Sequence, residues 1–355
     1  MTCQCLLLTQ SGHGELSRNL VRRPVLVSGA AMRRREVITL VVSVVIGFPV
    51  FAYAQQPTVP KVGFVYPGPK GAVPPRIEAI ISGLRVGGYS PPGVELVIRV
   101  ADGDPTQVRP LTEEILAKNV DVFVANGPAV LDVARRATQT TPIVALDLET
   151  DPVASGIAAT LAHPEGNVTG VFLDFPDFTT KWIELLKESN PKLSRIAVLW
   201  DPTTGPVQLE SIRRAAGLFK IELDILEMRS AFNFEEAFSG ARQRSADAIV
   251  LLSSPLISAN VQVLAELAIR HKLSAITLFP DFARAGGLLA YGPNLLALYR
   301  RTGVLAGKIL GGVKAGEVPI ERPTKFELVL NLKTATALSL AVSASLLLRA
   351  DEVIE

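Results

Sequence analysis

Cysteine is nearly absent from this chain of 355 residues, which contains only Cys3 and Cys5. Both lie upstream of an arginine-rich leader, so the rest of the chain has no disulfide, thiol nucleophile or cysteine ligand for a metal. Histidine is also scarce: only His163 and His271 follow residue 54, and nothing in their spacing is typical of a metal site. We therefore expect no metal and no cofactor.

Common nucleotide-binding and hydrolase motifs are missing as well. No G-x-G-x-x-G run follows an expected strand, and no G-x-S-x-G elbow occurs. The segment Gly303–Lys308 is one residue short of a P-loop and lies inside an expected helix. The sequence thus argues against these dinucleotide, nucleoside triphosphate and serine-hydrolase sites.

An excess of positive charge is absent once the leader is set aside. Residues 1–54 hold six of the 36 basic and two of the 34 acidic residues, which leaves 30 basic and 32 acidic residues. A slightly acidic body offers no electrostatic basis for binding nucleic acid.

The leader itself has the three parts of a secretory signal. Arg33–Arg35 precede an apolar run, Val37–Phe51, which ends in Ala52-Tyr53-Ala54. We expect residues 32–54 to be a signal peptide of the Tat or Sec type, with residues 1–31 an upstream extension before the true start at Met32. The apolar run is short for a membrane span, so we expect a soluble protein in the periplasm.

The body of the chain alternates short apolar runs with amphipathic helical patterns. In the central unit, an apolar run at 120–124 is broken by Asn126-Gly127-Pro128, which begins a helix, and a second apolar run follows at 143–146. Further strands are expected at 61–65, 94–100, 195–200, 221–226, 247–252, 275–278, 286–290 and 326–330, while the pattern pauses around 166–170. This alternation predicts an α/β protein with parallel, doubly wound sheets in two similar lobes.

Polar residues gather at the expected carboxyl ends of two central strands, where parallel sheets bind ligands. Asp147, Glu149 and Asp151 follow the strand at 143–146. They form either a solvated loop in which Asp151 caps a turn, or carboxylates that hold a ligand ammonium group. A metal site is a third reading, and it would need oxygen ligands from elsewhere in the chain.

Asn126 and Gly127 end the neighbouring strand and have the complementary property. The N–H groups of Gly127 and of the helix after it would attract a carboxylate, unless they form a plain helix N-terminus. An anion site beside a carboxylate cluster suits a zwitterion such as an amino acid. Tyr66 and Tyr291, which lie near the ends of two other strands, provide either flat apolar contacts for a ligand or core packing.

Several longer segments resemble a known family, the ABC-transporter substrate-binding proteins of the tryptophan/tyrosine-binding-like type. They are the leader MRRREVITL, HPEGNVTGV (163–171), AVLWDPT (197–203), FARAGGLLAYGPNLLALYRRTGVLAGKILGG (282–312), PTKFELVLNLKTATALSL (323–340) and LLLRADEVIE (346–355). The resemblance implies the type I periplasmic-binding fold, in which two doubly wound lobes joined by three hinge strands close on a ligand. It places residues 58–168 and 290–322 in lobe 1, and residues 169–289 and 323–355 in lobe 2.

The same resemblance extends the expected binding site. Asp151-Pro152 and Tyr291-Gly292 match motifs of the family, and Asp201 stands where the family usually has asparagine. The chain departs from the family at Asn126–Pro128, Asp147, Glu149, Asp174-Phe175 and Ser254. The full set of expected ligand-binding residues is Tyr66, Asn126, Gly127, Asp147, Asp151, Asp174, Asp201, Ser254 and Tyr291. Asp147 and Glu149 stand where the family has small or hydroxyl residues, and these extra carboxylates favour a ligand with amine or cationic character.

The resulting hypothesis is a monomeric, non-enzymatic receptor that binds an amino acid or a related amine or aromatic compound and delivers it to an ABC permease. One alternative is a secreted α/β enzyme that uses Asp147, Glu149 and Asp151 as acid and base. Such an enzyme needs a second group with a shifted pKa beside the base, and the sequence supplies no histidine or cysteine for this role. Another alternative, a ligand-sensing partner of a signalling protein, shares the fold.

Overall fold

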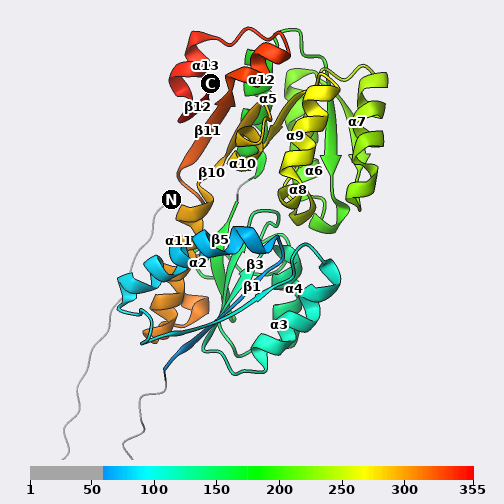
Figure 1. Cartoon of the computed structure of the whole chain (residues 1–355). Coiled ribbons are helices and arrows are strands. Elements are labelled where there is room, and N and C mark those ends of the chain that lie inside the picture. Colours follow the sequence, from blue (N-terminus) through cyan, green and yellow to red (C-terminus); the bar gives the residue numbers. More distant parts are fainter. Residues whose placement is uncertain (1–58, 174) are drawn as a thin grey trace, which may run out of the picture. The chain divides into compact units, whose positions relative to one another are not determined.

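The computed structural model describes residues 59–173 and 175–355, so the expected signal peptide, the upstream extension and Asp174 lie outside it. The described chain forms two β-sheets with helices on both faces (Figure 1). This architecture confirms the predicted α/β class with parallel sheets.

The first sheet contains five strands, all parallel, in the order β2-β1-β3-β4-β5. Its strands are β1 (Lys61–Tyr66), β2 (Glu95–Val100), β3 (Val122–Asn126), β4 (Ile143–Asp147) and β5 (Val168–Phe172). Two helices on one face, α2 (Val73–Leu84) and α11 (Leu295–Leu310), pack on each other, and α3 (Val108–Leu116) and α4 (Pro128–Ala137) cover the other (Figure 1).

The second sheet contains seven strands in the order β12-β11-β10-β9-β8-β6-β7, and only the β10–β11 pair is antiparallel. Its strands are β6 (Arg195–Trp200), β7 (Glu222–Glu227), β8 (Ala248–Leu251), β9 (Ser274–Thr277), β10 (Leu289–Pro293), β11 (Phe326–Asn331) and β12 (Glu352–Ile354). Its helices are α5 (Phe175–Ser189), α6 (Val207–Phe219), α7 (Phe234–Gln243), α8 (Pro255–Ala259), α9 (Val261–Arg270), α10 (Pro280–Arg284), α12 (Leu332–Ala337) and α13 (Ala344–Arg349).

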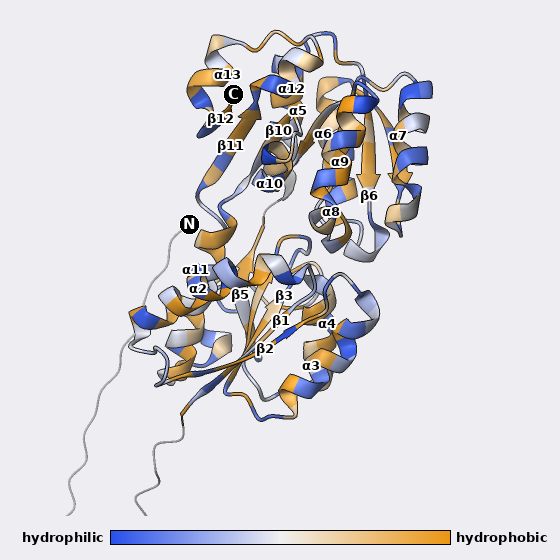
Figure 2. Cartoon of the chain, in the orientation of Figure 1, coloured by the Kyte–Doolittle hydropathy of each residue, from blue (hydrophilic) through white to orange (hydrophobic). Residues whose placement is uncertain are grey.

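Both faces of each sheet are apolar, because helices cover both (Figure 2). Along β1, Val62 and Phe64 pack toward α2 and α11, whereas Val65 joins the core beneath α3 and α4. In the second sheet, Val198 packs in the same core as helix α6, and Leu199 packs against α7 and α9. Burial on both faces explains why these strands read as continuous apolar runs rather than alternating ones.

Strand β5 is the main element that the sequence pattern did not predict. It forms at 168–172, where the pattern pauses, and it pairs with β4 at the edge of the first sheet. At Gly170 the φ angle is +149°, and a Cβ atom there would lie 2.0 Å from the carbonyl oxygen of Ala145. Glycine therefore lets β5 approach β4, although it weakens the strand signal in the sequence.

Two of the expected lobe boundaries fall inside strands of the structure. The boundary at 168/169 lies within β5, which belongs wholly to the first sheet, and the boundary at 289/290 lies within β10, which belongs to the second. Among the described residues, the chain passes between the sheets after β5, after β10 and before β11. Three adjacent passages are the expected hinge of a two-lobed protein.

Helices α2 and α11 touch through glycine. A Cβ atom on Gly83 would lie 2.0 Å from the carbonyl oxygen of Arg300, and one on Gly303 would lie 2.1 Å from that of Ile80. Only glycine permits this approach of the two backbones. Because α2 carries Arg76 and α11 carries Tyr299, the contact also sets the spacing of two residues of the binding site described below.

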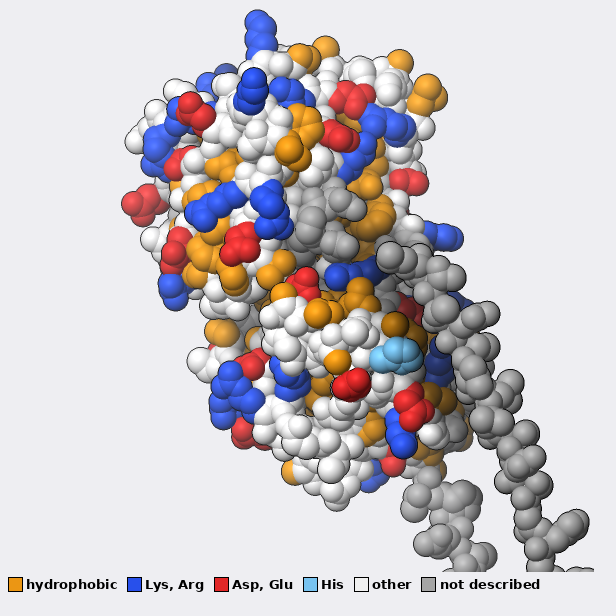
Figure 3. All heavy atoms as spheres, turned by 180° about the vertical axis from the view of Figure 1, so that it is seen from behind, with side chains coloured by type: hydrophobic (Ala, Val, Ile, Leu, Met, Phe, Trp, Pro, Cys, Tyr) orange, Lys and Arg blue, Asp and Glu red, His pale blue; other side chains and the backbone are white. Residues whose placement is uncertain are grey.

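The surface shows mixed charge. On the face seen in Figure 3, basic and acidic side chains are interspersed rather than gathered by sign. Within the described ranges, no helix is long and apolar enough to cross a membrane, and no group of acidic and histidine side chains is arranged to hold a metal ion.

Candidate ligand-binding site

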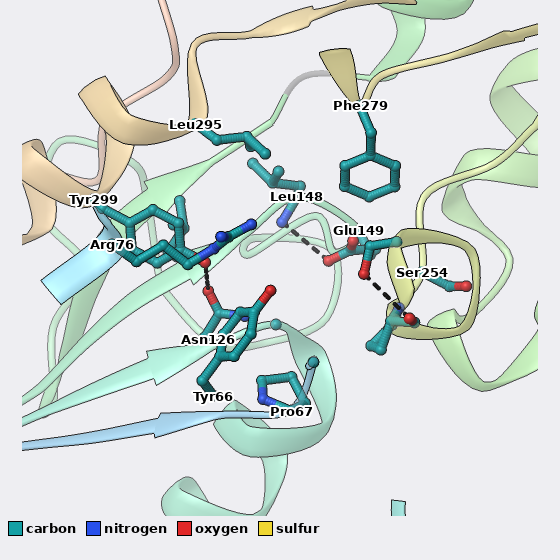
Figure 4. Close-up of a pocket in the computed structure, with 15 residues that line it drawn as sticks. Tyr66, Pro67, Arg76, Asn126, Leu148, Glu149, Ser254, Phe279, Leu295 and Tyr299 are labelled. Carbon is teal, nitrogen blue, oxygen red and sulfur yellow. Dashed lines mark hydrogen bonds between the residues drawn. The ribbon is translucent and has the colours of Figure 1, made fainter. Parts of the chain in front are cut away.

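A pocket lies where the carboxyl ends of strands from the two sheets face each other (Figure 4). The first sheet contributes residues that follow β1, β3 and β4, and the second contributes residues that follow β8 and β9. The lining residues include Tyr66, Arg76, Asn126, Leu148, Glu149, Ser254, Phe279, Leu295 and Tyr299. The cavity volume is about 60 Å³.

Aromatic and aliphatic side chains form most of the pocket wall. The Tyr299 side chain is only 4% exposed, and its O–H group donates a hydrogen bond to Asn126 Oδ1 at 2.6 Å. The Phe64 ring meets the Tyr299 ring edge-on at a centroid distance of 6.2 Å. Burial raises the pKa of Tyr299 above its usual value, so this phenol remains a hydrogen-bond donor.

Asp147 organises the turn that follows β4. Its side chain is fully buried, and Oδ1 accepts backbone hydrogen bonds from Glu149 at 2.9 Å and Thr150 at 3.0 Å. Among the described residues, Oδ2 has no hydrogen-bond partner. Burial raises the pKa of Asp147 because the charged form loses its hydration. This turn directs the Glu149 side chain into the pocket.

Glu149 connects the two sheets. Its Oε1 accepts a hydrogen bond from the Ser253 hydroxyl, beyond β8, at 2.5 Å, and Oε2 accepts one from the Leu148 N–H at 3.2 Å. Burial, together with the nearby Asp147 carboxylate, raises the pKa of Glu149 to about 8. At neutral pH this carboxyl group is therefore mainly protonated.

A buried glutamine positions Ser253 for this contact. Gln208 on α6 is fully buried, its Oε1 accepts the Ser253 N–H at 2.7 Å, and its Nε2 donates to the Ser253 carbonyl oxygen at 2.8 Å. Both backbone groups of Ser253 are satisfied by one side chain. This clamp holds the serine hydroxyl toward Glu149.

We expect Ser253→Ala to lower the free energy of unfolding by about 1–2 kcal/mol, because the buried Glu149 oxygen loses its donor. Urea denaturation measures this loss. The control is Ser258→Ala, which removes a half-buried hydroxyl that donates to the Pro255 carbonyl oxygen of its own helix. Equal losses in the two variants would contradict a special role for the bond between the sheets.

Comparison with known proteins decides the family. The model for "ABC transporter substrate binding protein" matches residues 72–354, which is most of the chain. The chain belongs to the ABC transporter substrate-binding proteins. The prediction drawn from the sequence motifs is thereby confirmed.

Similar proteins support the same conclusion about the fold. A tyrosine-binding protein of Clostridioides difficile (strain R20291) is 23% identical over 268 residues, which cover 74% of this chain and 76% of that protein. The structure of an ABC domain with L-Trp from Streptococcus pneumonia has a TM-score of 0.77 at 21% identity, and it covers 83% of this chain and 99% of that one. A conserved domain protein from Vibrio cholerae has the same TM-score and coverages at 22% identity.

Four residues predicted from the sequence line the pocket of this substrate-binding protein: Tyr66, Asn126, Gly127 and Ser254. Two of them have less free hydrogen-bonding capacity than expected. The Gly127 N–H donates to the Leu146 carbonyl oxygen at 2.8 Å, so it is not free for an anion. Ser254 Oγ accepts the Ile257 N–H at 3.1 Å, which caps α8.

The other predicted residues do not line the pocket. Asp151 caps a turn by accepting the Val153 and Ala154 N–H groups, each at 2.9 Å, and Asp201 accepts the Thr203 N–H at 2.9 Å. The Tyr291 ring stacks on Phe178 at a centroid distance of 5.4 Å, within the second sheet's aromatic packing. Asp147 lies behind the pocket wall, where its carboxylate accepts the backbone hydrogen bonds of the turn that carries Glu149. Asp174 lies outside the described residues.

Sequence reasoning missed Arg76, Phe279 and Tyr299, and it identified Glu149 only as part of the acidic cluster. Phe279 follows the strand expected at 275–278, and Tyr299 belongs to α11, so both are far from the central unit along the chain. Arg76 could have been identified from the sequence. It is the one basic residue of the helix that follows the first strand, and it lies in the first turn of that helix, directly after two prolines.

Proposed function

We propose that this protein is the extracytoplasmic receptor of an ABC importer, and that it binds an amino acid or a related aromatic or amine compound between its two sheets. The observation that carries the proposal is the pocket itself, which combines aromatic walls with ionisable groups. Tyr66, Phe279 and Tyr299 provide flat apolar surface, and Glu149 with the turn behind it provides acidic oxygens.

Two of the similar proteins bear on the ligand class. One is described as tyrosine-binding, and the other was crystallised with L-Trp. The pocket here has matching apolar surface, although its acidic turn gives it a polar side of its own. We infer a ligand with an apolar or aromatic side chain and at least one group that exchanges hydrogen bonds with a carboxyl group.

Binding requires the sheets to move apart. The cavity of about 60 Å³ is well below the roughly 300–1,000 Å³ of typical ligand pockets. Admission of an amino acid must therefore break the Glu149–Ser253 hydrogen bond, and the three passages between the sheets provide the hinge. Closure around the ligand would then present a defined surface to a membrane permease. Export by the expected signal peptide at residues 32–54 would bring the protein to the periplasm, where such receptors meet their ligands.

A thermal-unfolding screen tests the proposal. The chain from residue 55 onward is titrated with L-tryptophan, L-tyrosine, L-phenylalanine, L-leucine, the corresponding amines and a polyol. A ligand at about 100-fold its dissociation constant stabilises the folded state by about 2.7 kcal/mol. We expect this stabilisation from at least one amino acid or amine and not from the polyol.

A pair of variants locates the binding event. Ser258→Trp places an indole in the pocket wall and should abolish ligand stabilisation, whereas Ser239→Trp alters a comparably half-buried serine on α7, away from the pocket. Retention of full stabilisation in Ser258→Trp would contradict binding at this pocket. Stabilisation by the polyol alone would contradict the ligand class.

A further inference from the structure

Arg76 occupies an unusual position in the pocket wall. Its guanidinium carbon lies 5.0 Å from the centre of the Tyr66 ring and 5.5 Å from the centre of the Tyr299 ring. Nη1 donates a hydrogen bond to the Ala72 carbonyl oxygen at 2.5 Å. The side chain is half-buried and, in Figure 4, directs its nitrogen atoms into the pocket. Two aromatic rings and one backbone bond therefore fix the orientation of the guanidinium.

The hydrogen bonds of Arg76 are incomplete. Its Nε atom is buried, and among the described residues it has no hydrogen-bond partner. A buried N–H group without an acceptor has lost its hydration without compensation, and this cost is larger when the group is charged. Nη1 is used by the Ala72 carbonyl oxygen, so the guanidinium keeps unused hydrogen-bond donors.

The charge of Arg76 is also unbalanced. Arg99 and Arg301 pair with Glu114 and Glu321, but within the described part of the chain no carboxylate lies within 4.0 Å of the Arg76 guanidinium. Glu149 is the acidic side chain in the same pocket wall, and it is engaged with Ser253. A half-buried cation beside a cavity, with no carboxylate within ion-pair distance, is stabilised by an anion that enters the cavity.

We propose that Arg76 binds the carboxylate of the ligand, so that the receptor selects amino acids over the corresponding amines and amides. This inference rests on the proposed function and names the chemical group that the ligand must carry. A guanidinium presents parallel N–H donors that match the two oxygens of a carboxylate. Leu148, Phe279 and Leu295 line the same pocket and receive the apolar side chain, while Glu149 faces the pocket on the side away from Arg76 (Figure 4).

The test compares each amino acid with its own amide, for example L-tryptophan with L-tryptophanamide, since the two differ chiefly in the negative charge. Dissociation constants are measured by calorimetry at pH 6 on the chain from residue 55 onward. The same pairs are measured with tyrosine, phenylalanine and leucine. In the unmodified protein we expect the acid to bind at least tenfold more tightly than the amide.

Variants at position 76 assign this preference to the guanidinium. Arg76→Met should weaken binding of the acid at least 30-fold and leave the amide nearly unchanged, so that the preference disappears. Arg76→Lys should restore part of it, because an ammonium keeps the charge but not the paired donors. Arg85→Met, at an exposed arginine beyond the end of α2, is the matched control and should leave both constants unchanged.

The outcomes separate the two proposals. If no compound in the panel binds the unmodified protein, the proposed function fails and this inference fails with it. If compounds bind but the acid and its amide bind equally, or if Arg76→Met keeps the preference, only the role of Arg76 is overturned. Should Arg76→Met fail to fold, the acid-to-amide ratio of the unmodified protein and of Arg76→Lys still decides the question.

Discussion

Raising the pH from about 4.5 to about 8 is expected to lower the free energy of unfolding, and Glu149 is the main reason. Burial and the Asp147 carboxylate raise the pKa of Glu149 from an ordinary 4.5 to about 8. Between these values the folded protein holds a proton that the unfolded chain releases. Stability is therefore fully present below about pH 4.5 and is lost as the pH rises through 8.

The magnitude follows from proton linkage. One extra proton in the folded state gives a slope of at most about 1.4 kcal/mol per pH unit, or roughly 4 kcal/mol over the whole window. Burial raises the pKa of Asp147 as well, so its contribution has the same sign. By contrast, Glu114, whose pKa is lowered to about 2 by Arg99, titrates below this window and acts in the opposite direction.

Urea denaturation at half-unit pH intervals from 4.5 to 8.5 measures the slope. Glu149→Gln removes the main titrating group while keeping a neutral side chain of the same shape, so its slope should be clearly smaller, with only the contribution of Asp147 remaining. Glu78→Gln, at an exposed position on α2, is the control and should retain the slope of the unmodified protein. A stability that rises across the window, or an unchanged slope in Glu149→Gln, would contradict the assignment.

Gly303→Ala is expected to lower the free energy of unfolding by about 3 kcal/mol, although alanine is the better helix former by about 1 kcal/mol. The added methyl group would lie 2.1 Å from the Ile80 carbonyl oxygen. A backbone atom cannot turn aside as a side chain can, so α2 and α11 must separate. The separation moves Arg76 and Tyr299 apart, and ligand affinity should fall with stability.

Gly217→Ala provides the matched control. Gly217 is an exposed glycine inside α6, and a Cβ atom there would meet nothing within 4 Å. It should gain up to about 1 kcal/mol from helix propensity and leave ligand binding unaltered. Chemical denaturation of both variants measures the difference. If the two substitutions change stability in the same direction, the tight contact between α2 and α11 is not the cause.

The prediction of the fold succeeded where local patterns are strong. Buried parallel strands leave continuous apolar runs, and prolines and glycines mark their ends, so ten of the strands were expected close to their observed positions. Strand β5 was missed because Gly170 interrupts its apolar pattern, although its place is secured by pairing with β4. The short β12 was missed because its stability depends on pairing with β11.

The site was predictable only in part. The rule that ligands lie at the carboxyl ends of parallel strands indicated Tyr66, Asn126, Gly127 and the acidic turn. It could not distinguish Glu149, which reaches the pocket, from Asp147 and Asp151, which cap turns. That difference depends on the direction in which each side chain points within one turn, and the sequence pattern does not encode this direction.

By itself, the sequence determined the α/β class, the two-lobed organisation and the family, because these depend on patterns that extend over many residues. Only the tertiary structure decided which polar side chains come together. Arg76 comes from the second helical segment of the chain, Glu149 from the central unit and Ser253 from beyond β8, and they converge because two separate sheets turn their carboxyl ends toward one pocket. Contacts between residues so distant along the chain arise from packing, which sequence periodicity does not encode.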